Sequence, residues 1–115
     1  MHHIDSNNLA SLAADLAEHL SLITGETWSA APHQHRADVR TLHAARDGAE
    51  LMVEPARERR RLLIVGSFWI EDDLDNHKPT RDRHHTITAA AERPVIAIAR
   101  DIARRLLPAY RADLA

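Results

Sequence analysis

The stretch Arg61-Leu62-Leu63-Ile64-Val65-Gly66-Ser67-Phe68-Trp69-Ile70 carries the strongest strand pattern in the chain and predicts the central strand of a β-sheet. Successive side chains of a strand point to opposite faces of the sheet. One face of this run is aliphatic with Phe68, and the other holds Leu63, Val65 and Trp69. Because both faces are apolar, the sheet needs a covering layer on at least one side.

Shorter strand patterns lie on both sides of this run. Residues 37–43 alternate, Asp47-Gly48 is a two-residue turn signal and residues 51–53 return, which together predict a hairpin. Residues 85–89 alternate as a further strand, and residues 26–31 are a candidate edge strand. Adjacent strands joined by short turns run antiparallel. We therefore expect an antiparallel meander of four or five strands.

Two amphipathic helices flank the predicted meander. Apolar residues recur at three- and four-residue steps from Leu9 to Ile23, and Gly25 stands where a left-handed residue ends a helix. A second helix begins near Pro94, since proline is tolerated in a first turn. Pro108 should end or kink it, although residues 110–114 could continue for a turn. Both helices need an apolar surface to cover. The sequence therefore predicts an α+β two-layer sandwich in the order α-β-β-β-β-α, with both helices on one sheet face.

The composition fits one soluble domain spanning residues 1–115. The chain is 44% hydrophobic and 28% charged, and its length is enough to bury a core without disulfides or a metal. It has no cysteine, which excludes disulfides, thiolate zinc sites and cysteine nucleophiles. No signal peptide or apolar run of about 18 residues is apparent, so we expect a cytoplasmic protein without membrane contact. The net charge of −2 provides no overall attraction to nucleic acid.

The second apolar face of the central strand is the first candidate binding surface. A two-layer sandwich buries only one face of its sheet, so Leu63, Val65 and Trp69 form a patch for a protein partner or for a second copy in a homodimer. Tryptophan is enriched at binding hot spots, which favours this interpretation. The alternative is that the N-terminal arm or a displaced helix covers the patch.

Arginines on the last helix form the second candidate surface. At about 100° per residue, Arg93, Arg100, Arg104 and Arg111 fall within about 40° of one another, opposite the apolar stripe. Such a row could follow a nucleic-acid phosphate backbone or hold an acidic protein. The alternative is a solvated helix face that Asp101 neutralises.

A further arginine cluster lies in the turn before the central strand and includes Arg59 and Arg61. Charge in an exposed turn usually serves solubility. These two arginines would extend the predicted row only if the fold places the turn beside the last helix.

No pattern in the sequence predicts catalysis, a cofactor or a resident metal. The three glycines are too far apart to form a phosphate-binding loop, and Thr41, His43 and Asp38 along one strand do not make a catalytic triad. Carboxylates and histidines within residues 71–85 could hold a divalent ion, but their spacing matches no calcium loop and a hydrated loop is the alternative. We therefore expect a non-enzymatic binding protein without a cofactor.

Two resemblances bear on the role of the chain. The outline of a three-stranded meander between two helices, the last of them basic, is similar to the double-stranded RNA-binding domain and implies RNA binding. The chain departs from that family in two respects: its last helix begins Ala91-Glu92-Arg93-Pro94 without lysines, and the strand at Thr86 is additional. The alanine- and arginine-rich ending, residues 94–108, looks like small uncharacterised proteins of actinobacterial phages and mobile elements. That resemblance implies an accessory role, such as host- or defence-modulating binding.

Overall fold

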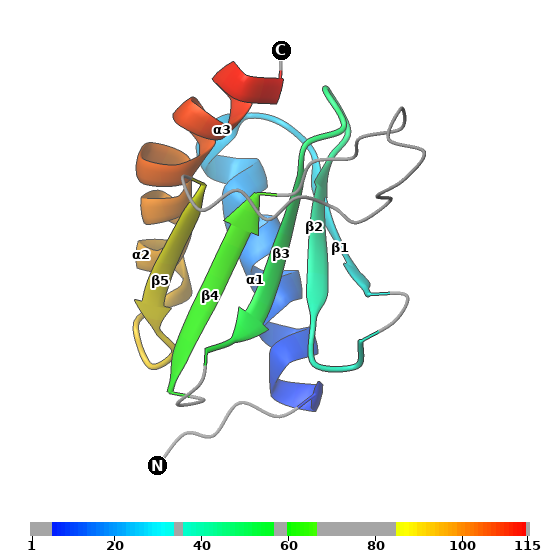
Figure 1. Ribbon diagram of the computed structural model, residues 1–115, viewed down its shortest axis with the longest axis vertical. Helices are drawn as coiled ribbons and strands as arrows, with labels where there is room; N and C mark the ends of the chain where they lie inside the picture. Colours follow the sequence, from blue (N-terminus) through cyan, green and yellow to red (C-terminus); the bar gives the residue numbers. More distant parts are fainter. Residues whose placement is uncertain (1–5, 34–35, 57–59, 67–84, 115) are drawn as a thin grey trace, which may run out of the picture.

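The computed structural model describes residues 6–33, 36–56, 60–66 and 85–114, which form one five-stranded sheet with its helices on one face (Figure 1). The elements are α1 (Ser6–Thr24), β1 (Trp28–Pro32), β2 (Arg40–Ala44), β3 (Glu50–Pro55), β4 (Arg61–Gly66), β5 (Thr86–Ala90), α2 (Val95–Asp101), a π-helical turn η1 (Ile102–Leu106) and α3 (Leu107–Leu114). The predicted α+β fold is confirmed, and the candidate edge strand is present as β1.

The sheet is an open meander in which every strand pairs antiparallel with the next one along the chain, in the order β1-β2-β3-β4-β5. Val53 lies opposite Ile64, and Ile64 lies opposite Ile87. This register places the aliphatic residues of neighbouring strands on one face, as the period of two requires. The three positions are buried there against the helices.

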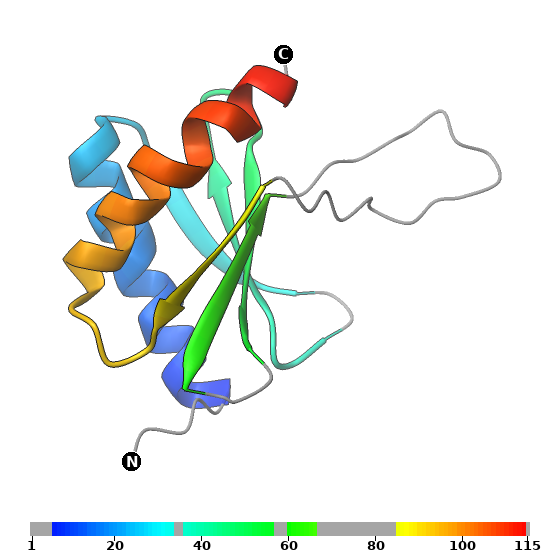
Figure 2. The ribbon, with the colours of Figure 1, turned by 60° about the vertical axis from the view of Figure 1, so that its left-hand side comes forward.

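The helices cover only that face. In Figure 2, α1 and the continuous α2–η1–α3 segment lie on the same side of the sheet. Helix α1 packs on α2, β1 and β2, and η1 packs against β5. Leu9, Leu16 and Leu20 are fully buried, so the predicted apolar stripe of the first helix is the stripe that faces the core.

The turns follow the predicted glycines, with one correction. Gly25 ends α1 in the left-handed region at φ +72°, and its N–H donates to the Ser21 carbonyl at 3.0 Å. Gly48 also has a positive φ of +71°, but the closing pair of this hairpin is Ala44–Ala49. This closing pair encloses four residues, and five residues separate β2 from β3, so the predicted two-residue turn is wrong. The Gly48 N–H donates to the Ala44 carbonyl at 3.1 Å, which closes the wider turn.

The central strand is described as far as Gly66, and residues 67–70, with Phe68 and Trp69, lie outside the described residues. The predicted strand over residues 37–43 begins only at Arg40, because Arg36 to Val39 form a turn in which the Val39 N–H donates to the Arg36 carbonyl at 3.4 Å.

The last helix continues past Pro108 instead of ending there. Proline has no N–H to donate and its ring clashes with the carbonyl four residues back, which an α-helix cannot accommodate without distortion. Here the chain widens into η1 directly before it, and the Leu107 N–H donates to the carbonyl of Ile102, five residues back. This wider turn absorbs the proline, so α3 follows without a break.

Candidate binding surfaces

The outer face of the sheet, opposite the helices, is less open than the sequence predicts. Leu63 and Val65 do lie on this face, where they cluster with Val39 and Met52. Leu63 is half-buried, whereas Val65 is only 3% exposed. Trp69 lies outside the described residues, so the proposed contact through Leu63, Val65 and Trp69 stays a prediction. Both described helices pack on the other face, so neither of them is the cover that the alternative required.

A hydroxyl, an imidazole and a carboxylate lie next to one another, in that order, on the same outer face of the sheet. Thr41 Oγ1 is 3.0 Å from His43 Nε2, and His43 Nδ1 is 3.4 Å from Glu50 Oε2 on the neighbouring strand. This order is that of a catalytic relay, and sequence reasoning missed it because Glu50 reaches His43 only by strand pairing. However, Thr41 is 5% exposed and its hydroxyl also donates to the Ala31 carbonyl at 3.3 Å. A nucleophile must reach its substrate, so the geometry favours a cross-strand structural network.

The fold places the turn before β4 beside the start of the last helix. The Ala91 N–H donates to the Arg60 carbonyl at 2.8 Å, and Arg61 lies opposite Ala90 in the sheet. The Arg93 N–H in turn donates to the Ala90 carbonyl at 3.1 Å. The condition under which the turn arginines would extend the helix row is therefore met for Arg60 and Arg61.

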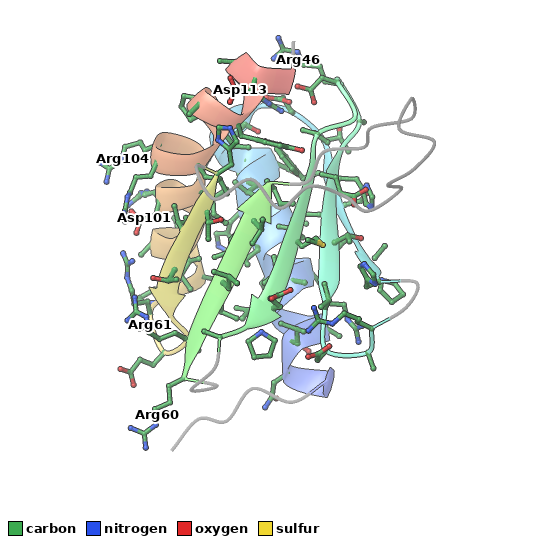
Figure 3. All side chains as sticks on the ribbon, in the orientation of Figure 1. Arg46, Arg60, Arg61, Asp101, Arg104 and Asp113 are labelled. Atoms are coloured by element: carbon green, nitrogen blue, oxygen red, sulfur yellow. The ribbon has the colours of Figure 1, made fainter. Side chains whose placement is uncertain are left out.

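We call this surface the arginine flank. Figure 3 shows Arg60, Arg61 and Arg104 directed outward along the same side of the molecule, with Asp101 between them. The members of the arginine flank are Arg60, Arg61, Arg93, Arg100, Arg104 and Arg105. Arg93 is half-buried and the other five are exposed. Arg59, which the sequence also predicted for this surface, lies outside the described residues.

Asp101 neutralises part of the arginine flank. Its Oδ2 accepts a hydrogen bond from Arg93 Nη1 at 2.7 Å, and its Oδ1 lies 3.7 Å from Arg104 Nη2. The hydrogen bond from Arg93 and the nearby positive charges hold the pKa of Asp101 below its usual range. Arg100 has no ion pair among the described residues, so its charge is available to a partner.

Arg111 leaves the predicted row and turns toward the core. The extra residue in the π-helical turn rotates all later positions by about 100° relative to a regular α-helix. Its guanidinium donates to both Glu26 oxygens at 2.6 Å, lies 3.1 Å from Asp47 Oδ2, and stacks 5.6 Å from the ring centroid of Trp28. The hydrogen bonds from Arg111 lower the pKa of Glu26, although partial burial acts in the opposite direction. The arginine row therefore ends before Arg111, which is a structural clamp.

Tyr110 anchors the last helix to the end of the sheet. Its hydroxyl donates to the Glu50 carbonyl at 2.9 Å and accepts from the Glu50 N–H at 3.1 Å. Its ring lies directly over Gly66, where a side chain would collide with it. A glycine inside a strand pattern often marks such a close approach, so Gly66 was the signal that could have revealed this contact.

His85 also contacts this tyrosine. The two rings meet edge to face with their centroids 5.8 Å apart. His85 Nε2 is 2.6 Å from Asp113 Oδ2, so the final turn of α3 is held to the start of β5. The imidazole is buried whereas Asp113 is exposed, and this pair fastens the C-terminal helix from the solvent side.

Other predicted features fall outside the described residues or find no support within them. Residues 71–84 of the acidic and histidine-rich segment are not described. In the described ranges, no group of three or more potential ligands could hold a metal ion. No helix of the described part is long and apolar enough to cross a membrane.

Comparisons with protein-family models, with curated proteins and with solved structures find no match.

Proposed function

We propose that this chain is a non-enzymatic binding protein that contacts an acidic partner, a protein segment in the first instance, through the arginine flank. The observation that supports this proposal is the meeting of two arginine groups far apart in the sequence. Arg60 precedes β4 and Arg61 begins it, and the other four follow β5. Among the described residues, the segments that carry these six arginines, 60–61 and 91–105, hold two carboxylates, Glu92 and Asp101.

The local charge matters more for binding than the net charge of the chain. Exposed charges are screened beyond roughly 8 Å at physiological ionic strength, so a partner near the flank experiences mainly these arginines. Arginine also pairs carboxylates and phosphates through two parallel hydrogen bonds. The flank therefore suits an acidic polypeptide, and a nucleic acid is the second candidate.

The arginines of the last helix, considered without those beside β4, are the feature that favours nucleic acid as the partner. Arg100 to Arg105 extends over roughly 8 Å at about 1.5 Å per residue, enough to meet more than one phosphate. In the described segments that carry the flank, 60–61 and 91–105, no aromatic side chain is present on which a base could stack. Binding would then rest on phosphate contacts and would not distinguish base sequence.

The two candidates separate in a titration of the intact chain with labelled polyglutamate and with labelled random-sequence duplex DNA and single-stranded RNA. The test variant carries Arg100→Gln with Arg104→Gln, and the control carries Arg40→Gln with Arg46→Gln, which removes the same charge elsewhere. We expect polyglutamate to bind, to weaken as salt rises, and to lose about tenfold in affinity in the test variant only. Stronger binding of nucleic acid would select the second candidate. Absence of binding to every probe at low salt would overturn both.

A further inference from the structure

β5 is the last strand of the sheet, so one side of its backbone faces away from β4 (Figure 1). The Gly66 N–H donates to the His85 carbonyl at 2.9 Å, and the Ala91 N–H donates to the Arg60 carbonyl at 2.8 Å. In an antiparallel pair, residues whose backbone groups bond to the neighbouring strand alternate with residues whose N–H and carbonyl groups point away from it. The odd-numbered residues from 85 to 91 therefore direct their backbone groups toward β4, and the even-numbered residues direct theirs outward.

The outward backbone groups belong to Thr86, Thr88 and Ala90. The Ala90 carbonyl accepts the Arg93 N–H, and the remaining outward N–H and carbonyl groups have no backbone partner in the described ranges. Thr88 is exposed. Natural sheet edges are usually protected by lysine, proline or a bulge, because unpaired edges recruit further strands. The sequence Thr86–Ala90, Thr-Ile-Thr-Ala-Ala, has neither lysine nor proline.

The opposite edge of the sheet shows such protection. By the same alternation, Trp28, Ala30 and Pro32 point away from β2. The Trp28 N–H donates to Ser21 Oγ at 2.9 Å, and Pro32 has no N–H to offer. The β1 edge is therefore largely closed by α1 and by a proline, and within the part of the chain that the structure describes the β5 edge offers the longer run of outward groups.

We propose that β5 accepts an extended acidic segment of a partner protein as a sixth strand. This inference rests on the proposed function, because the arginine flank borders the same edge. Arg61 Nη2 donates to Thr88 Oγ1 at 3.1 Å, which holds a guanidinium at the middle of β5 on the outer face. On the other face, η1 packs against β5 and carries Arg104 and Arg105. An added strand would hydrogen-bond through its backbone and place alternate carboxylates toward each face.

A second copy of the chain fits this edge less well. Two β5 strands pairing about a twofold axis through Thr88 would bring two Arg61 guanidinium groups together, and like charges directly opposite are destabilising. A nucleic acid would meet the arginines but has no peptide backbone to continue the ladder. The open edge therefore favours an acidic polypeptide.

The test uses the intact chain and peptides selected against it from a random peptide library. Thr88→Pro removes an outward N–H without breaking a bond to β4, and proline is tolerated on an edge strand. Thr88→Val removes only the hydroxyl, and Ala30→Pro places proline at an outward position of the other edge. We expect acidic peptides to be enriched, and their affinity to fall about tenfold or more in Thr88→Pro. The affinity should fall less in Thr88→Val, which keeps the outward N–H and loses only the bond to Arg61, and it should be unchanged in Ala30→Pro.

Amide hydrogen exchange in the wild-type chain keeps the test decisive if Thr88→Pro does not fold. Bound peptide should slow amide exchange at Thr86, Thr88 and Ala90. If the peptide slows exchange elsewhere but not at these three amides, strand addition is refuted. If Arg100→Gln with Arg104→Gln weakens binding but Thr88→Pro does not, the edge inference fails and the proposed function survives. If neither variant changes binding, both fail. A dimer that Thr88→Pro disrupts would also overturn the inference, in favour of self-pairing.

Discussion

Replacing Gly66 by alanine should destabilise the protein because of one ring. An ideal Cβ at this position would lie 2.7 Å from Tyr110 Cε1 and 2.8 Å from Cγ, and closer still to Cδ1. Tyr110 is fully buried, and its hydroxyl is held by both backbone groups of Glu50, so the ring cannot move freely. Gly66 has no positive φ, so the expected cost comes from the collision and not from backbone strain.

The magnitude follows from two contributions. Overpacking of a well-filled core costs about 1–3 kcal/mol. A shifted ring would also weaken two hydrogen bonds, at about 0.5–1.5 kcal/mol each. We therefore expect Gly66→Ala to lower the free energy of unfolding by about 2–6 kcal/mol, against a total of roughly 6–17 kcal/mol for a chain of this length. The melting temperature should fall by roughly 4 °C for each kcal/mol.

Urea unfolding followed by circular dichroism measures this cost, and a second background isolates its cause. In Tyr110→Ala the collision is absent, so Gly66→Ala should cost less than about 1 kcal/mol there and reveal a coupling of about 1 kcal/mol or more. Gly48→Ala is the matched control, since its cost of about 1–2 kcal/mol comes only from a left-handed backbone. An equal cost of Gly66→Ala in both backgrounds would refute the reasoning.

Three further predictions concern the clamps around the sheet. Arg111→Met should lower the free energy of unfolding by about 1.5–3 kcal/mol in urea denaturation, because the partly buried Glu26 loses its charged hydrogen bonds; no change would show that the clamp is dispensable. Because the pKa of Glu26 is lowered in the folded state, its contribution to stability is complete above the ordinary carboxyl range and is lost as pH falls through the folded-state pKa. Glu26→Gln should therefore be less stable than the wild type at neutral pH, and its free energy of unfolding should decline less steeply below about pH 4. An unaltered pH profile would contradict that assignment. Ser21→Ala should cost about 1 kcal/mol and speed amide exchange at Trp28, whose N–H it caps; unchanged exchange would leave the β1 edge without this protection.

The sequence predicted only part of the arginine flank. The helical period aligned Arg93, Arg100 and Arg104 correctly because that period is a local property of the backbone. It failed at Arg111, since the response of a helix to Pro108 can be a break, a kink or a wider turn. Packing of Tyr110 over Gly66 and pairing of Arg111 with Glu26 accompany the wider turn in this structure.

The sequence by itself determined the strands, the helices and the face of each that enters the core, because periods of two and 3.6 are written along the chain. Only the tertiary structure decided which arginines remain available and which sheet edge stays open. Glu26 neutralises an arginine 85 positions away, and Ser21 closes an edge seven positions away, so these outcomes depend on how the helices cross the sheet. The open β5 edge beside Arg61 is a product of that arrangement.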